Sequence, residues 1–305
     1  MRPYVSPLRI LGIIAIACVI AGSAQLSFAQ SVMYGSTGRQ SSSPGAIGTV
    51  DETTAVVAVV GLTGRPVLAG LAFNSLGDLY GISCDSALGP ENCSLIVIDP
   101  DTGAEIADIG LVTFGGADAP HWIPDLAIQP GTDTLYATHL YLGLVTIDTA
   151  TAAITVINPA LPSGNTNAGG LTFTPDGRLF FASSLITSTE FWELNPTTGA
   201  TVSTISLSIQ VGLSGLGARP ADGLVFGTTR PWQQPGVLPD LVTLDVATGT
   251  VTTVGIPNEF LSDVDFRPEP LFADVAVPAG GPAAWTLTAM LLLGAGIAIL
   301  SRRGM

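Results

Sequence analysis

The stretch Gly170-Leu171-Thr172-Phe173-Thr174-Pro175-Asp176-Gly177-Arg178-Leu179-Phe180 decides the fold. It consists of two short apolar runs joined by a Pro-Asp-Gly turn. Proline presets φ for a turn and glycine supplies a positive φ, so the stretch predicts a tight hairpin of two strands. Neither run has the 3.6-residue periodicity of a helix.

The same pattern occurs five times along the chain. Its repeated apolar position is occupied in turn by Leu71, Leu126, Leu171, Leu216 and Val264. A second hairpin follows, with the turns Asp99–Gly103, Asn195–Gly199 and Asp245–Gly249 and a degenerate copy at 145–151. Four strands in a unit of about 45 residues are typical of a β-propeller blade.

The chain ends predict how the ring closes. Residues 47–51 match the third and fourth strands of a blade, and the last repeat supplies a first strand at Val264 and a second at 270–272. We therefore expect an all-β propeller of about five four-stranded blades over residues 45–276, with one blade shared between the chain ends. Such closure removes an open sheet edge.

Both ends of the chain have the features of targeting segments. Residues 1–29 predict a signal peptide cut between Ala29 and Gln30, or after Ala24, and residues 30–44 predict a flexible linker. Residues 283–300 are uncharged and long enough to cross a bilayer. Residues 277–282 form a short linker before this helix, and residues 301–305 form a basic tail expected in the cytoplasm.

The charge between these segments is strongly acidic. All 24 acidic residues lie there, whereas four of the ten arginines belong to the end segments. Nucleic acid is therefore not an expected partner. Two cysteines remain after processing, and in an oxidising compartment we expect a Cys84–Cys93 disulfide. They lie in the segment 83–94, to which we assign the extra length of the first unit, as a recognition loop or a stapled insertion.

The strand–turn–strand and Asp-Pro-x-Thr-Gly pattern over 45–275 resembles the YVTN/NHL-like and lactonase-like propellers of exported bacterial proteins. The C-terminal segment resembles the IPTL- and PEP-CTERM sorting signals, through Val277, Pro278, Gly280, Gly281, Trp285, Arg302 and Arg303. This resemblance implies cleavage by an exosortase-like enzyme, after signal peptidase has acted, and transfer from the inner membrane to the cell surface. Gly280-Gly281 leaves a rhomboid-like protease open, and a plain membrane anchor is the other alternative.

Candidate ligand residues lie where the chain enters the innermost strands, at the expected mouth of the central channel. They are His121, Trp122, Asp125, Asn167 and Asp263. In a lactonase-like propeller, Asp125, Asn167 and Asp263 would hold a divalent metal. No nucleophile motif accompanies the two histidines. The sequence therefore favours a non-enzymatic binding or structural module without a cofactor, with a metal-dependent propeller hydrolase as the alternative; it does not identify the ligand.

The sorting prediction is tested by mass spectrometry of the mature protein from its native host. We expect an N-terminus at Gln30 and a C-terminus between Val277 and Gly281. An intact Met305 would instead indicate a simple membrane anchor.

Overall fold

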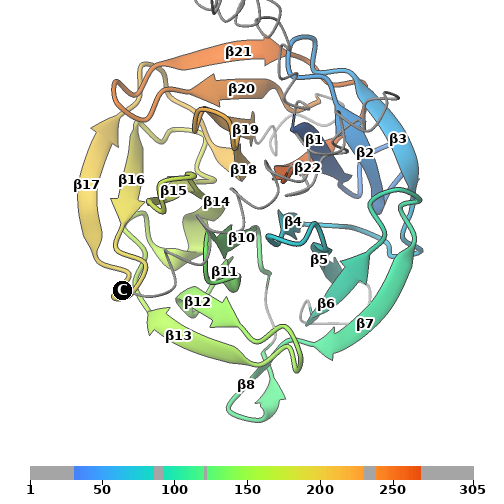
Figure 1. Ribbon diagram of the computed structural model, residues 1–305. Coiled ribbons are helices and arrows are strands. Elements are labelled where there is room, and N and C mark those ends of the chain that lie inside the picture. Colours follow the sequence, from blue (N-terminus) through green and yellow to red (C-terminus); the bar gives the residue numbers. More distant parts are fainter. Residues whose placement is uncertain (1–30, 86–91, 120–121, 230–237, 269–305) are drawn as a thin grey trace, which may run out of the picture. The chain divides into compact units, whose positions relative to one another are not determined.

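The computed structural model describes residues 31–85, 92–119, 122–229 and 238–268. In this part of the chain, five four-stranded antiparallel sheets surround a central axis (Figure 1). The protein is a five-bladed β-propeller, and the predicted fold is confirmed. The predicted signal peptide, sorting segment and membrane helix lie outside the described residues. Within those residues, no helix is long and apolar enough to span a membrane.

Each blade runs from an innermost to an outermost strand. Blade 1 comprises β4 (Gly70–Phe73), β5 (Leu79–Asp85), β6 (Asn92–Ile98) and β7 (Glu105–Leu111). Blade 2 comprises β10 (Leu126–Gln129), β11 (Thr134–His139), β12 (Gly143–Ile147) and β13 (Ile154–Asn158). Blade 3 comprises β14 (Ala168–Phe173), β15 (Leu179–Ser183), β16 (Glu190–Leu194) and β17 (Thr201–Ser206). Blade 4 comprises β18 (Leu213–Ala218), β19 (Val225–Thr229), β20 (Leu241–Leu244) and β21 (Val251–Gly255).

The fifth blade is shared between the chain ends, but not in the predicted proportion. Its strand order is β22 (Leu261–Arg267), β1 (Val32–Thr37), β2 (Ala46–Val50) and β3 (Val57–Leu62). The second strand of this blade is therefore β1, from the N-terminal region, whereas the segment 270–272 predicted for that position lies outside the described residues. The predicted linker 30–44 contains β1. Glycine, serine and threonine in β1 conceal a strand whose residues from Met33 to Thr37 are all buried.

The core is divided among the five interfaces between neighbouring blades. Each interface holds one cluster of buried apolar side chains contributed by two adjacent sheets. The inner strands are covered on both faces; all six residues of β14, for example, are buried. Continuous burial explains why these strands read as apolar runs rather than as alternating patterns.

A polar turn closes the outer hairpin of every blade. In four of the turns the side chain of an Asp or Asn accepts the backbone N–H groups two and three residues later. In the turn of Asp99 the hydroxyl group of Thr102 replaces the second N–H. The five accepting residues are Asp51, Asp99, Asp148, Asn195 and Asp245. Hydrogen bonds from Thr53 and Thr54 lower the pKa of Asp51 to about 2. The prediction that these residues form turns is confirmed, and the turn containing Asp51 adds a fifth copy.

The Cys84–Cys93 disulfide is confirmed, and both half-cystines are buried. They face each other in the β5–β6 ladder and pack in the core between blades 1 and 2. They are therefore part of the hairpin rather than of an exposed loop. The extra length of the first unit is not confined to residues 83–94, because a hairpin of β8 (Thr113–Phe114) and β9 (Ala117–Asp118) also precedes blade 2.

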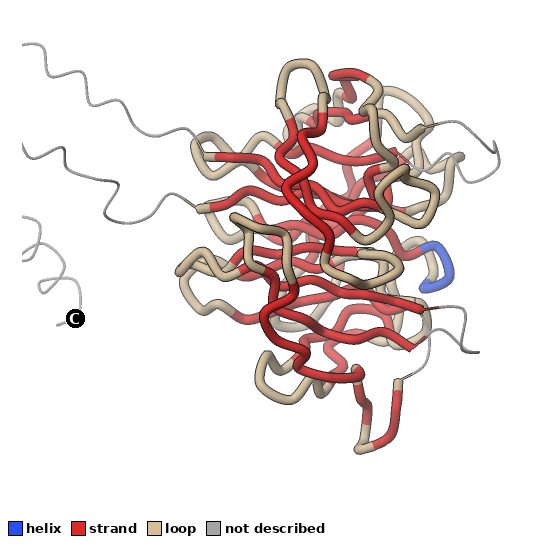
Figure 2. The backbone as a smooth tube through the Cα atoms, turned by 90° about the vertical axis from the view of Figure 1, so that its right-hand side faces the viewer, coloured by secondary structure: helices blue, strands red, loops and turns tan. Residues whose placement is uncertain are grey.

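The ring has two different faces, seen edge-on in Figure 2. We call them the loop face, where chain segments enter the innermost strands, and the turn face, where these strands end. The short 3₁₀-helix η1 (Asn165–Asn167) directly precedes β14 and so lies on the loop face. On the turn face, Val32 at the start of β1 pairs with Arg267 at the end of β22.

Two turn glycines allow the cost of backbone strain to be measured apart from the cost of a packing clash. Gly177 and Gly249 both have positive φ, of 85° and 72°. A Cβ at 177 would meet nothing within 4 Å, whereas one at 249 would overlap the backbone carbonyl of Ser206 in blade 3. We expect Gly177→Ala to lower the free energy of unfolding by about 1 kcal/mol and Gly249→Ala by roughly two to three times as much. Urea denaturation measures both, and equal losses would contradict the close contact between blades.

Candidate functional site

A single position in each repeat controls the centre of the channel. It directly precedes the repeated leucine or valine and is occupied by Gly70, Asp125, Gly170, Gly215 and Asp263. A Cβ at Gly70 would lie 2.9 Å from Asp125 Cα, and one at Gly215 only 2.5 Å from Asp263 Cα. The three glycines therefore leave room for two carboxyl side chains and no others.

These two carboxyl groups accept hydrogen bonds from all five innermost strands. Asp125 accepts the N–H groups of Leu171 (2.7 Å) and Leu216 (3.0 Å) and that of its neighbour Leu126. Asp263 accepts those of Leu71 (2.7 Å) and its neighbour Val264. The five donors are the five repeated positions of the sequence. We call this arrangement the carboxyl layer.

The pKa values of both carboxyl groups in the layer are raised. Both side chains are buried, with no exposed surface. Burial and the adjacent Asp263 raise the pKa of Asp125 well above 3.8, and burial raises that of Asp263 despite a hydrogen bond from Asp125. Because two neighbouring buried carboxylates do not both ionise easily, we expect the pair to keep one proton at a pH where isolated carboxyls have lost theirs.

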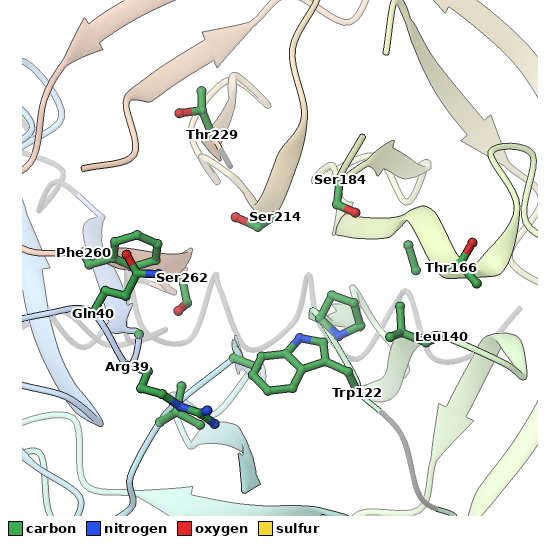
Figure 3. A pocket seen from close by; sticks show the side chains of 15 residues that line it. Arg39, Gln40, Trp122, Leu140, Thr166, Ser184, Ser214, Thr229, Phe260 and Ser262 are labelled. Atoms are coloured by element: carbon green, nitrogen blue, oxygen red, sulfur yellow. The ribbon is translucent and has the colours of Figure 1, made fainter. Parts of the chain in front are cut away.

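A cavity of about 370 Å³ opens above the carboxyl layer, on the loop face. We call it the loop-face cavity. Segments from all five blades line it, and its polar side chains are those of Arg39, Gln40, Trp122, Thr166, Ser184, Ser214, Thr229 and Ser262. Figure 3 shows the Trp122 indole reaching into the cavity, while Arg39 and Gln40 enter from the β1–β2 loop. Its size is within the range of small-molecule sites, roughly 300–1,000 Å³.

The structure separates the residues that the sequence placed together at the channel mouth. Trp122 lines the loop-face cavity, but Asp125 and Asp263 lie below it in the carboxyl layer. Asn167 lies in η1, where its amide donates to the Ser163 carbonyl (2.9 Å). His121 lies outside the described residues.

The predicted metal ligands make their described contacts with the protein itself. The carboxyl oxygens of Asp125 and Asp263 accept backbone N–H groups and are buried below the cavity. The Asn167 amide is held by its own loop. Among the described residues, no three His, Cys, Asp or Glu side chains are grouped as metal ligands.

Sequence reasoning missed most of the cavity wall. Arg39 and Gln40 lie in the segment predicted as a linker, whereas Ser184 directly follows the second strand β15 and Thr229 ends the second strand β19. Their signal was available in the repeat itself. In a propeller, the loop after each second strand returns to the same face as the segment entering the first strand, so both line the channel mouth.

A second cavity of about 280 Å³ opens on the turn face. Apolar side chains line it, including Phe73, Phe173 and Phe266, and its rim carries a proline four residues after the repeated position in four blades: Pro130, Pro175, Pro220 and Pro268. Asp265 is on its wall and accepts the Phe73 N–H (2.8 Å). Burial raises the pKa of Asp265 to about 7.

Comparison with known proteins finds only distant structural similarities. No protein-family model and no curated protein matches the sequence. A hydrazine synthase from Kuenenia stuttgartiensis aligns over 62% of this chain and 49% of its own, at 16% identity and a TM-score of 0.39; this chain thus spans about half of that protein. A Bacteroides caccae protein of unknown function aligns over 79% of this chain and 100% of its own, at 12% identity and TM-score 0.47. A proposed 6-phosphogluconolactonase from Bacteroides uniformis aligns over 73% of this chain and 66% of its own, at 13% identity and a TM-score of 0.40.

Removing one carboxyl should loosen the ring. Asp125→Ala leaves the N–H groups of Leu171 and Leu216 buried without an acceptor, at about 1–3 kcal/mol each. Asp125→Asn keeps an acceptor oxygen and should lose less. Urea denaturation of both variants measures the free energies of unfolding. Equal losses from the two substitutions would show that the hydrogen bonds contribute little.

The shared proton should also give a pH dependence. The folded pair keeps a proton above pH 3.8, where the carboxyl groups of the unfolded chain lose theirs. The free energy of unfolding should therefore fall as pH rises from about 4 towards the raised pKa of the pair, by at most about 1.4 kcal/mol per pH unit. Asp125→Asn removes one titrating group. The stability that the variant loses relative to the wild type should therefore become smaller as pH rises. A difference independent of pH would exclude the shared proton.

Proposed function

We propose that this protein is an exported, non-enzymatic binding module, and that its ligand site is the loop-face cavity. The observation that carries the proposal is the division of the channel. The carboxyl layer lies between the two cavities, so the channel is a blind pocket on the loop face rather than a through-pore. Five blades contribute to its wall, which suits a ligand held from several sides.

The chemistry of the wall favours binding over catalysis. Its described side chains supply hydroxyl groups, one amide, one guanidinium and one indole, which orient and hold a polar ligand. The carboxyl groups that a lactonase-like hydrolase would use are buried below the cavity, where they accept backbone N–H groups. Hydrolysis would need a nucleophile or a metal-bound water, for which these residues provide no arrangement.

Export is supported by the sequence and is consistent with the disulfide. A removable N-terminal segment and a C-terminal sorting segment would deliver the propeller across the inner membrane and then to the cell surface. The buried Cys84–Cys93 disulfide belongs to a protein that folds in an oxidising compartment.

The proposal is tested by screening the purified protein against monosaccharides, hydroxy acids and amino acids for a rise in melting temperature, which a bound ligand produces. We expect at least one compound to stabilise the wild type. Trp122→Ala and Ser214→Phe should abolish the shift. Tyr141→Ala, which removes an exposed aromatic outside the cavity, should preserve it.

Two results would contradict the proposal. Stabilisation that survives both cavity substitutions would place the site elsewhere. Hydrolysis of a lactone that requires added divalent metal, and is lost in Asp125→Asn, would support the propeller hydrolase instead.

A further inference from the structure

Arg39 differs from the other arginines of the described chain. Arg65, Arg178, Arg219 and Arg267 each form an ion pair with an Asp or Glu, at 2.5–2.8 Å. Among the described residues, Arg39 forms no such pair and lines the loop-face cavity. Its guanidinium is thus available to an external anion.

The wall around Arg39 is also unlike the rest of the protein. The chain contains 24 acidic residues and only ten basic ones. Yet the described residues that line the loop-face cavity include one arginine and no Asp or Glu. A cavity wall whose described side chains carry one cation and no carboxylate, in an acidic protein, marks a local preference for a negatively charged ligand.

The loop that carries Arg39 is held in place by a buried carboxylate. Glu259 accepts hydrogen bonds from the Ser41 hydroxyl and from the backbone N–H and hydroxyl of Ser42. Burial opposes ionisation, but these hydrogen bonds lower the pKa of Glu259 overall, so it remains charged. The Gly38 N–H donates to the Phe260 carbonyl (2.9 Å) on the other side of Arg39. The loop is therefore fixed at both flanks of Arg39 before any ligand arrives.

The remaining walls suit a ring with one apolar face and several hydroxyl groups. Trp122 offers a flat aromatic surface inside the cavity (Figure 3). Hydroxyl groups of Ser184, Ser214 and Ser262 line the cavity from blades 3, 4 and 5, and each can both donate and accept a hydrogen bond. Sugar rings combine these two characters.

We propose that the loop-face cavity binds a small sugar acid. Its carboxylate pairs with the Arg39 guanidinium, whose planar fork matches two carboxylate oxygens. The apolar ring face lies against Trp122, and the ring hydroxyls bond to the serine and threonine side chains. This inference rests on the proposed binding function and adds the class of ligand.

The test compares glucuronate, galacturonate and mannuronate with their neutral parent sugars and with the matching sugar 6-phosphates, by calorimetric titration of the purified protein. We expect at least one uronate to bind at least tenfold more tightly than its parent sugar, with an affinity that falls as salt rises. Arg39→Gln should remove this preference, so that the uronate no longer binds more tightly than its parent sugar. Arg39→Lys should restore part of it, because lysine keeps the charge but loses the fork.

Arg267→Gln is the matched control, because Arg267 pairs with Asp101 and does not line the cavity; this variant should bind like the wild type. Equal binding of acid and neutral sugars that is lost in Trp122→Ala would overturn the sugar-acid assignment and leave the binding function intact. Tighter binding of the phosphates would overturn the carboxylate assignment in the same way. Uronate binding that survives both Trp122→Ala and Ser214→Phe would overturn both proposals, and no uronate binding to the wild type would overturn this inference.

Discussion

The closed ring depends on two carboxyl groups that accept five backbone N–H groups at the axis. Each innermost strand has one such donor at the same repeat position, and a channel without acceptors would leave these donors buried and unpaired. Asp125 and Asp263 lie on non-adjacent blades and together reach all five. Exact fivefold symmetry would place five carboxyls in this space, where their charges would repel and their atoms would collide. The repeat therefore has to vary at this one position.

This variation explains how one channel contains a structural centre and a variable mouth. Below the mouth, side-chain identity is restricted by contact between neighbouring backbones. Above it, residues come from loops and connecting segments, whose lengths differ among blades. Polar side chains such as Ser214 and Ser262 can therefore occupy equivalent positions on two blades while Ala69 and Pro124 occupy them on others. Asymmetry of this kind is what a specific ligand site on a repetitive scaffold requires.

The fold could be predicted from the sequence because its signals are local and repeated. Turn residues and apolar runs recur in each unit, so an error in one unit is corrected by the others. β1 was missed because the strand that forms the inner hairpin with it, β22, lies at the other end of the chain. The segment Val32–Thr37 is therefore not preceded by the first strand and turn that identify the other second strands. The site was harder to predict. Asp125 and Asp263 were predicted to lie at the channel mouth, but they are buried below it. Their burial depends on glycines in three other repeats, which no local pattern around either aspartate reveals.

The pairing of Val32 with Arg267 fixes more than the closure of the ring. Both ends of the described propeller leave from the turn face, side by side. A tether attached to either end therefore joins the ring at its turn face. A tether short enough to restrain the ring would therefore direct the loop-face cavity away from the point of attachment.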